Sequence, residues 1–188
     1  QKGVQTFYLN LEDLGDSNDF FSSLETGGLD DVLAALRAGH GGLADFAAEQ
    51  ALIDPGTGVS YFGPSARADR MADLTAQDWI GLLNALKASG SYGRIFVDCG
   101  FGLDEKHLAM MEAADRIVLV TDGGETANTK FRRGLQAVSA WEQQEGKNIT
   151  DKMILFYNRF SSSKSSSRLD GIDLPVVGTM PPVKHALV

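Results

Sequence analysis

The sequence predicts an α/β fold in which helices cover a doubly wound, mostly parallel β-sheet. The first observation is a series of short, continuous apolar runs, a pattern typical of strands that are buried on both faces. The second is that these runs alternate with segments whose apolar residues recur at helical spacing. The third is that polar residues directly follow several runs, at the carboxyl ends where open α/β sheets bind their ligands.

The apolar runs are rich in aromatic and branched side chains, which are the residue types that favour strands. The second run stops at Gly63 and Pro64, two residues that commonly end a strand. The predicted strands are residues 6–11, 59–62, 95–97, 117–120, 152–157 and 176–177.

Four segments carry apolar residues on one helical face. In the first, Leu29, Val32, Leu33 and Leu36 follow the spacing i, i+3, i+4, i+7, and Gly39 can end the helix. In another, the hydroxyl of a threonine at the start can cap the helix. The predicted helices are residues 29–36, 75–90, 104–114 and 126–144.

Composition bounds the function. A chain of 188 residues with 43% hydrophobic and 22% charged residues fits one soluble domain. The net charge of −8 argues against binding to the nucleic-acid backbone, and we expect Lys130, Arg132 and Arg133 to lie on a solvated helix face. The single cysteine excludes an internal disulfide and fits a reducing compartment. The apolar runs are too short to span a bilayer.

The stretch "IFVDCGFGLDE" ends an apolar strand on Asp98 and continues into a turn with two glycines. A buried carboxylate without a partner is costly, so Asp98 needs either a structural hydrogen bond, for example as a helix cap, or a bound cation. Asn10, Glu12 and Asn158 also lie at the carboxyl ends of predicted strands, as do Thr121 and Asp122. This grouping favours a ligand site at the carboxyl edge of the sheet.

The order and spacing of several motifs resemble the MinD/ParA family of deviant P-loop ATPases. The motifs are "YLNLED", the strand ending in Asp98, "EAADRIVLVT", the late "NR" after a strand, and "LPVVGTMPP". The similarity runs from about Thr6 to Pro182 and is greatest to the Tad/Cpa-type pilus-positioning branch and related septum-site proteins. It implies a P-loop NTPase fold.

The resemblance implies roles for residues near the predicted strand that ends at Asp98. Asp98 matches the acidic residue that holds Mg²⁺ through water, a mode that suits a cation that keeps its own waters. Gly100 and Gly102 match the switch segment that approaches the γ-phosphate. Asn10 and Glu12 match paired acidic positions that align water or the metal.

The resemblance also implies a site for the adenine base of ATP. Asn158 matches the asparagine that hydrogen-bonds the base, since a side-chain amide offers both a donor and an acceptor. Arg159 follows it directly, and Pro181 and Pro182 match the loop that lies against the base. In the alternative interpretation, Asn158 and Arg159 form only a turn at the end of a strand.

The chain departs from the family at three places. Nothing in it matches the Gly-rich phosphate loop with its lysines. The segment "QKGVQT" is a false match, because it has one glycine and leads into a strand where the family has a helix. The proline that usually follows the aspartate is replaced by Cys99, Gly100 and Phe101. Asn10 is an amide where the family has an acid, so hydrolysis is in question even if nucleotide binds.

Two explanations account for the missing phosphate loop. We expect residues 1–188 to form a single ATPase domain whose first strand and phosphate loop lie upstream of residue 1. In the alternative, the chain is a degenerate member that keeps the fold as a non-hydrolysing scaffold for protein contacts. A dinucleotide-dependent enzyme is a further rival, although no Gly-x-Gly-x-x-Gly motif opens a helix here.

The resemblance therefore implies a cytoplasmic ATPase that binds ATP and Mg²⁺, hydrolyses ATP slowly if at all, and forms a homodimer. Its role would be to position a pilus or secretion apparatus, at the cell pole or the inner face of the membrane. DNA is not an expected partner, and membrane attachment would need segments outside this chain.

Overall fold

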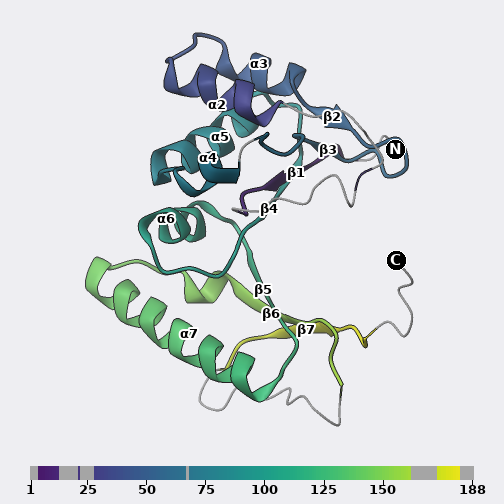
Figure 1. The fold of residues 1–188 in the computed structure, drawn as a ribbon. Coiled ribbons are helices and arrows are strands. Elements are labelled where there is room, and N and C mark those ends of the chain that lie inside the picture. Colours follow the sequence, from purple (N-terminus) through teal and green to yellow (C-terminus); the bar gives the residue numbers. More distant parts are fainter. Residues whose placement is uncertain (1–3, 13–20, 22–27, 67, 162–172, 183–188) are drawn as a thin grey trace. The chain divides into compact units, whose positions relative to one another are not determined.

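The structure is a computed structural model that describes residues 4–12, 21, 28–66, 68–161 and 173–182. The chain divides into two compact units, Gln1–Met110 and Met111–Val188. Each unit contains a β-sheet with one or more helices packed on it, and Figure 1 labels the elements of both.

The first unit contains a four-stranded sheet with the order β2-β3-β1-β4. Strand β1 (Thr6–Asn10) lies between β3 (Ser60–Tyr61) and β4 (Arg94–Asp98) and is parallel to both. Strand β2 (Leu52–Ile53) pairs with β3 in the antiparallel direction. The sheet is therefore mostly parallel, as the sequence predicts, with one short antiparallel edge.

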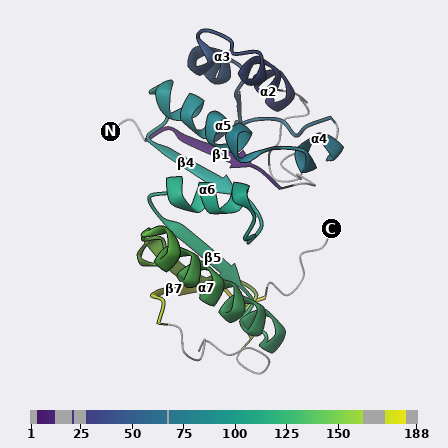
Figure 2. The same ribbon diagram turned by 90° about the vertical axis from the view of Figure 1, so that its left-hand side faces the viewer.

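Helices of the first unit pack on one another and on the sheet (Figure 2). They are α2 (Leu29–Arg37), α3 (Leu43–Glu49), α4 (Ala68–Ala72) and α5 (Ala76–Ala88), and α6 (Glu105–Ala113) follows β4. Helices α2 and α5 come so close at Gly81 that an added Cβ would lie 2.8 Å from the Leu36 side chain. This contact explains a glycine in the middle of a helix.

Large apolar side chains fill the core of the first unit. Phe7 of β1 is fully buried and meets Phe62 and Tyr92 edge-on, each at 4.8 Å between ring centroids. Trp79 and Leu82 of α5 are also buried, which confirms the predicted apolar face of this helix. Burying one such side chain is worth about 1.5–3 kcal/mol, so this face holds α5 against the unit.

The second unit contains a parallel sheet with the order β5-β6-β7. Strands β5 (Ile117–Thr121) and β6 (Met153–Tyr157) pair in register over five residues. Strand β7 (Val176–Thr179) pairs with β6 after a register shift between Leu155 and Phe156. Helix α7 (Glu125–Glu145) and the 3-10 turn η1 (Thr150–Lys152) connect β5 to β6.

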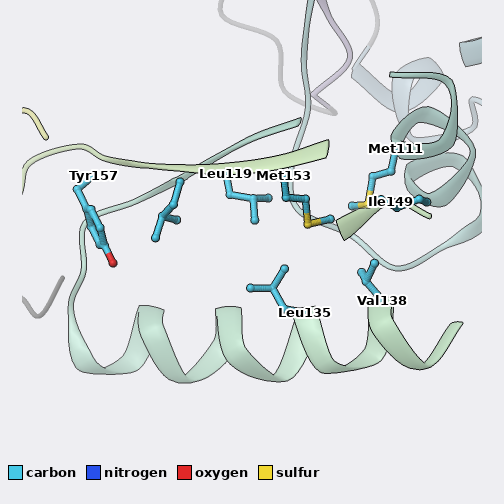
Figure 3. Close-up of a cluster of buried hydrophobic side chains, with 8 residues drawn as sticks. Met111, Leu119, Leu135, Val138, Ile149, Met153 and Tyr157 are labelled. Atoms are coloured by element: carbon cyan, nitrogen blue, oxygen red, sulfur yellow. The ribbon is translucent and has the colours of Figure 1, made fainter. Parts of the chain in front are cut away.

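A second apolar core lies between this sheet and α7 (Figure 3). Leu135 and Val138 of α7 point toward Leu119 of β5 and Met153 of β6. Trp141 of the same helix is half-buried and packs against this cluster. The apolar residues that recur at helical spacing along α7 therefore pack this helix against one face of the sheet.

The sheets end in strands of different character. Strand β2 has two residues and β7 is irregular, and both features are common in edge strands. Strands β4 and β5 are uninterrupted and apolar, yet within the described residues each hydrogen-bonds to one neighbour, β1 and β6 respectively. Phe96 of β4 and Val118 of β5 are more than half exposed. These two strands combine the composition of interior strands with the pairing of edges.

All six predicted strands and four predicted helices are present, with bounds that differ by a few residues. The sequence prediction missed α3, α4, β2 and η1. Strand β2 forms because Asp54 fixes the turn before β3, its Oδ2 accepting from the Thr57 amide at 2.8 Å and hydroxyl at 2.7 Å. Within the described residues, no helix combines the length and the apolar character that a membrane span requires.

One buried carboxylate ties α5 to α2. Asp78 forms a capping box with Thr75 at the start of α5, and it accepts two hydrogen bonds from Arg37 of α2, at 3.0 and 2.8 Å. The bonds from Arg37 are the main cause that lowers the pKa of Asp78 to about 2, and the bonds from Thr75 act in the same direction. Asp78 is thus held in its charged form by groups on two helices.

We expect Asp78→Asn to destabilise the protein by about 1–3 kcal/mol, because it weakens both the cap and the charged pair. The pKa of Asp78 is lower in the folded state than in the unfolded state, so its stabilising effect is complete above about pH 4 and is lost as the pH falls toward 2. Urea unfolding between pH 2 and 7 measures both effects. Asn at the exposed Asp31 is the control and should change stability by only a few tenths of a kcal/mol. Equal effects of the two substitutions would contradict the assignment.

A second buried carboxylate closes the turn after α7. Glu142 accepts hydrogen bonds from the amides of Ile149 and Thr150 and from the Thr150 hydroxyl, the last at 2.9 Å. The side chain is 7% exposed, so water cannot replace these donors. Glu142 therefore fixes the path of the chain from α7 into β6.

We expect Glu142→Gln to cost about 1–3 kcal/mol of unfolding free energy, since an amide NH₂ cannot accept from the donors that face it. Glu145→Gln, on the exposed end of the same helix, removes the same charge and should have little effect. Thermal unfolding of both variants provides the comparison, and an unchanged melting temperature for Glu142→Gln would contradict this role.

Candidate functional site

The end of β1 and the end of β4 lie side by side in the first unit. The parallel register pairs Asn10 with Asp98, and the Leu11 amide donates to the carbonyl of Asp98 at 2.8 Å. Asn10 is 8% exposed, whereas Asp98 is exposed to solvent. The structure therefore brings together two residues that the sequence predicts to share a site, although 88 positions separate them.

Asn10 uses one side of its amide to shape the chain. Its Oδ1 accepts a hydrogen bond from the Glu12 amide at 2.8 Å, so the oxygen that could bind a metal already has a donor. Its Nδ2 is buried and has no hydrogen-bond partner. A buried unpaired donor is unusual and suits an acceptor oxygen that a ligand or water brings.

Asp98 has its own donor. The hydroxyl of Tyr8 donates to Oδ2 of Asp98 at 2.6 Å. Sequence reasoning missed Tyr8, although its position two residues before Asn10 puts both on the same face of β1. A tyrosine two positions before a polar strand end was thus the signal that could have found it.

The segment after Asp98 is electronegative. Burial is the main cause that raises the pKa of the Cys99 thiol to about 11, and the negative charges of Asp98, Glu12 and Asp104 raise it further. Cys99 is thus protonated at neutral pH, which makes it an unreactive thiol. The same charges make this end of the sheet attractive to a cation.

The two glycines of the segment differ. Gly100 is exposed, and an added Cβ would meet nothing within 4 Å. At Gly102 an added Cβ would lie 2.4 Å from the His107 ring, which is hydrogen-bonded to Asp104 at 2.7 Å and edge-on to Trp79. The packing of His107 therefore accounts for the glycine at 102 without a ligand, while its predicted place near a phosphate stays a prediction.

Asp104 performs the capping role that was an alternative for Asp98. Its Oδ1 accepts a hydrogen bond from the His107 amide at 3.1 Å, at the first turn of α6. This bond and the side-chain bond from His107 lower the pKa of Asp104, whereas burial, the largest single contribution, acts in the opposite direction. Asp98 is therefore left free of this structural duty.

In the second unit, the predicted base-binding residues also come together. The backbone N–H of Asn158 donates to the backbone carbonyl of Thr121 at 2.8 Å, and this bond joins the ends of β6 and β5. The backbone N–H of Phe160 donates to the carbonyl of Met180 at 2.9 Å. The backbone N–H of Met180 donates to the carbonyl of Tyr157 at 2.7 Å. These bonds hold residues 158–160 beside Met180, which directly precedes Pro181 and Pro182.

Arg159 has an unusual backbone in this group. Its φ of 56° is left-handed, and it is the one non-glycine residue among those described that has a positive φ. Residues other than glycine rarely adopt this conformation, which turns the chain sharply after Asn158. Arg159, Pro181 and Pro182 are exposed, while Asn158 is half-buried.

The described residues contain no group of three or more His, Cys, Asp or Glu side chains that could hold a metal ion. A divalent cation at Asp98 would therefore take most of its ligands from water or from a bound molecule. This donor set fits Mg²⁺, which commonly binds through one or two carboxylates and keeps several waters.

No protein-family model and no curated protein matches the sequence. Among solved structures, a ParA family ATPase from Chlorobium tepidum is similar, with 15% identity and a TM-score of 0.75, over 97% of this chain and 73% of that one. A MinC:MinD cell division protein complex from Aquifex aeolicus is similar at 13% identity and a TM-score of 0.64. The match covers 95% of this chain and 69% of that one.

The septum site-determining protein MinD from Pyrococcus horikoshii, complexed with Mg-ADP, is also similar. It shares 17% identity at a TM-score of 0.63, over 95% of this chain and 69% of that one. At such identities the likeness concerns the fold. Together with the mostly parallel sheets, it confirms the α/β architecture that the motifs implied: the chain folds like the ParA and MinD proteins.

Proposed function

We propose that this chain is a nucleotide-dependent positioning ATPase, which binds ATP with Mg²⁺ and dimerises to place a pilus or secretion apparatus. The observation that carries the proposal is the pairing of Asn10 with Asp98 at the carboxyl end of β1 and β4. The fold shared with ParA and MinD proteins supports a positioning role, and the Mg-ADP bound by the Pyrococcus horikoshii protein supports this choice of cofactor.

Asp98 would hold Mg²⁺ through water, because it is exposed and the described residues contain no group of three or more His, Cys, Asp or Glu side chains that could hold the ion directly. When bound, Mg²⁺ would neutralise charge on the phosphates of the nucleotide. The buried Nδ2 of Asn10 would donate to an oxygen of a bound group, and the Oδ1 of Asn10 would keep the backbone of Glu12 in place. Glu12 and the backbone of Gly100 and Gly102 would lie beside this group.

Asn158 would bind the adenine base through its side-chain amide. The sharp turn at Arg159 and the bonds between residues 158–160 and Met180 would present Arg159, Pro181 and Pro182 to the same base. This arrangement gives a role in base binding to each of these four residues.

Partners would be a second copy of the chain and components of the positioned machine. The MinC:MinD complex supports binding to a partner protein through this fold. The net charge of −8 makes non-specific binding to DNA weak, because few cations are available to displace the counterions of the phosphates. We expect the protein in the cytoplasm, with recruitment to the pole or the inner membrane face through other segments or partners.

One observation favours a second candidate, a non-hydrolysing scaffold. The family position that holds an acid is Asn10 here, and its oxygen is occupied by the Glu12 amide. The site would then lack one charge that orients water or metal. Slow hydrolysis or none follows, and in the scaffold alternative the chain acts through protein contacts alone.

We expect Asp98→Asn in the intact protein to abolish the Mg²⁺ dependence of ATP binding and to leave the apo melting temperature nearly unchanged. The exposed carboxylate contributes little packing, and an asparagine oxygen still accepts from Tyr8. Calorimetric ATP titrations with Mg²⁺ and with EDTA measure the first effect. Asp115→Asn, an exposed carboxylate before β5, is the control. An unfolded Asp98→Asn variant would instead make Asp98 a structural residue.

We expect Asn158→Ala to weaken ATP binding about 5-fold to 10-fold, since one lost hydrogen bond is worth about 1 kcal/mol. The preference of the wild type for ATP over inosine triphosphate should disappear in the variant. Asn148→Ala, which changes an exposed asparagine of the same unit, should keep both properties. Equal ATP affinity of the wild type and Asn158→Ala would exclude a role for Asn158 in binding the base.

A further inference from the structure

Tyr8 connects β1 to the carboxylate of Asp98. The register pairs Tyr8 with Phe96 and Asn10 with Asp98, so the Tyr8 side chain reaches diagonally along the sheet to Asp98. The distance from the Tyr8 hydroxyl to Oδ2 of Asp98 is 2.6 Å, which is short for a hydrogen bond and typical of a bond to a charged acceptor.

Aromatic neighbours hold the Tyr8 ring. Phe21 meets it edge-on at 5.5 Å, and Phe21 stacks on Tyr61 at 4.2 Å between centroids. Tyr61 is the partner of Tyr8 in the pairing of β1 with β3, and it is fully buried. The ring of Tyr8 is thus confined on the β3 side, and its hydroxyl has a fixed direction toward β4.

The hydrogen bond from Tyr8 makes the two carboxylate oxygens of Asp98 different from each other. Oδ2 accepts from Tyr8, so Oδ1 is the oxygen that remains for another ligand. We propose that Tyr8 is a positioning residue, which fixes the Asp98 carboxylate so that Oδ1 faces the waters of the bound cation. This inference rests on the proposed function, because it assumes that Asp98 holds Mg²⁺ through water.

The exposure of Asp98 argues that the bond fixes orientation and does not compensate for burial. Water can reach Asp98, so its carboxylate would be solvated without Tyr8. Glu142 differs in this respect, because it is buried and its carboxylate accepts hydrogen bonds from the amide and the hydroxyl of Thr150 in place of water. Outer partners of this kind are known to tune metal binding by orienting the group that holds the metal.

The test compares Tyr8→Phe with Tyr61→Phe in the intact protein. Both changes remove one phenol oxygen, but the Tyr61 hydroxyl has no hydrogen-bond partner. We expect Tyr8→Phe to raise the Mg²⁺ concentration for half-maximal ATP binding by about 10-fold, the effect typical of losing such an outer partner. Tyr61→Phe should leave it unchanged, and both variants should keep the wild-type melting temperature.

A second readout needs no nucleotide. The carboxyl ¹³C resonance of Asp98 should move in Tyr8→Phe and stay in place in Tyr61→Phe, because the Tyr8 hydroxyl donates to the carboxylate and the Tyr61 hydroxyl has no hydrogen-bond partner. In the Asp98→Asn background, where ATP binding is expected not to depend on Mg²⁺, Tyr8→Phe should leave the ATP affinity unchanged. An equal effect of Tyr8→Phe in both backgrounds would show that Tyr8 acts elsewhere and would overturn the proposal.

The outcomes separate this inference from the proposed function. If the wild type binds ATP with Mg²⁺ and Tyr8→Phe has the same Mg²⁺ requirement, Tyr8 is not a positioning residue and the proposed function stands. If the wild type shows no Mg²⁺-dependent ATP binding, the proposed function fails and the positioning role fails with it. A shifted Mg²⁺ requirement with an unmoved ¹³C resonance would also overturn the role.

Discussion

The parallel pairing of β1 with β4 is the constraint on which the candidate metal site depends. Parallel strands end at the same edge of a sheet, so the polar residues that follow them meet although they are distant in the sequence. Here five consecutive pairs, from Thr6 with Arg94 to Asn10 with Asp98, fix that meeting. A slip of one residue would turn each side chain to the other face and separate Tyr8 from Asp98.

The fold could be predicted from the sequence because its signals are local. Continuous apolar runs predicted β5 and β6, and helical spacing predicted α5 and α7, each of which the structure confirms. The missed elements lack such signals. Helix α3 has seven residues, and the residue before it, Gly42, has no side chain to cap it. Strand β2 depends on the turn at Asp54, whose hydrogen bonds from Thr57 cannot be read from a periodic pattern.

The sequence predicts where the residues of the candidate site lie along the strands, but it does not predict their side-chain contacts. The position of Asp98 and Asn158 at strand ends follows from the pattern of runs, and the structure puts each at the end of its strand. The bond from Tyr8, the occupied oxygen of Asn10 and the contact of Gly102 with His107 depend on register and side-chain direction. Those quantities are set by pairing across the sheet, which one sequence does not display.

Cys99 gives the chain an internal chemical reporter. With its pKa raised to about 11, the thiol is almost entirely protonated at pH 7, so alkylating reagents should modify it slowly. Burial and the charges of Asp98, Glu12 and Asp104 are what suppress the thiolate. Since the sequence has no other cysteine, the mass of the intact protein after treatment with iodoacetamide follows this residue alone. Its labelling rate therefore measures, without any engineered residue, how closed and how negative the end of β4 is under each condition.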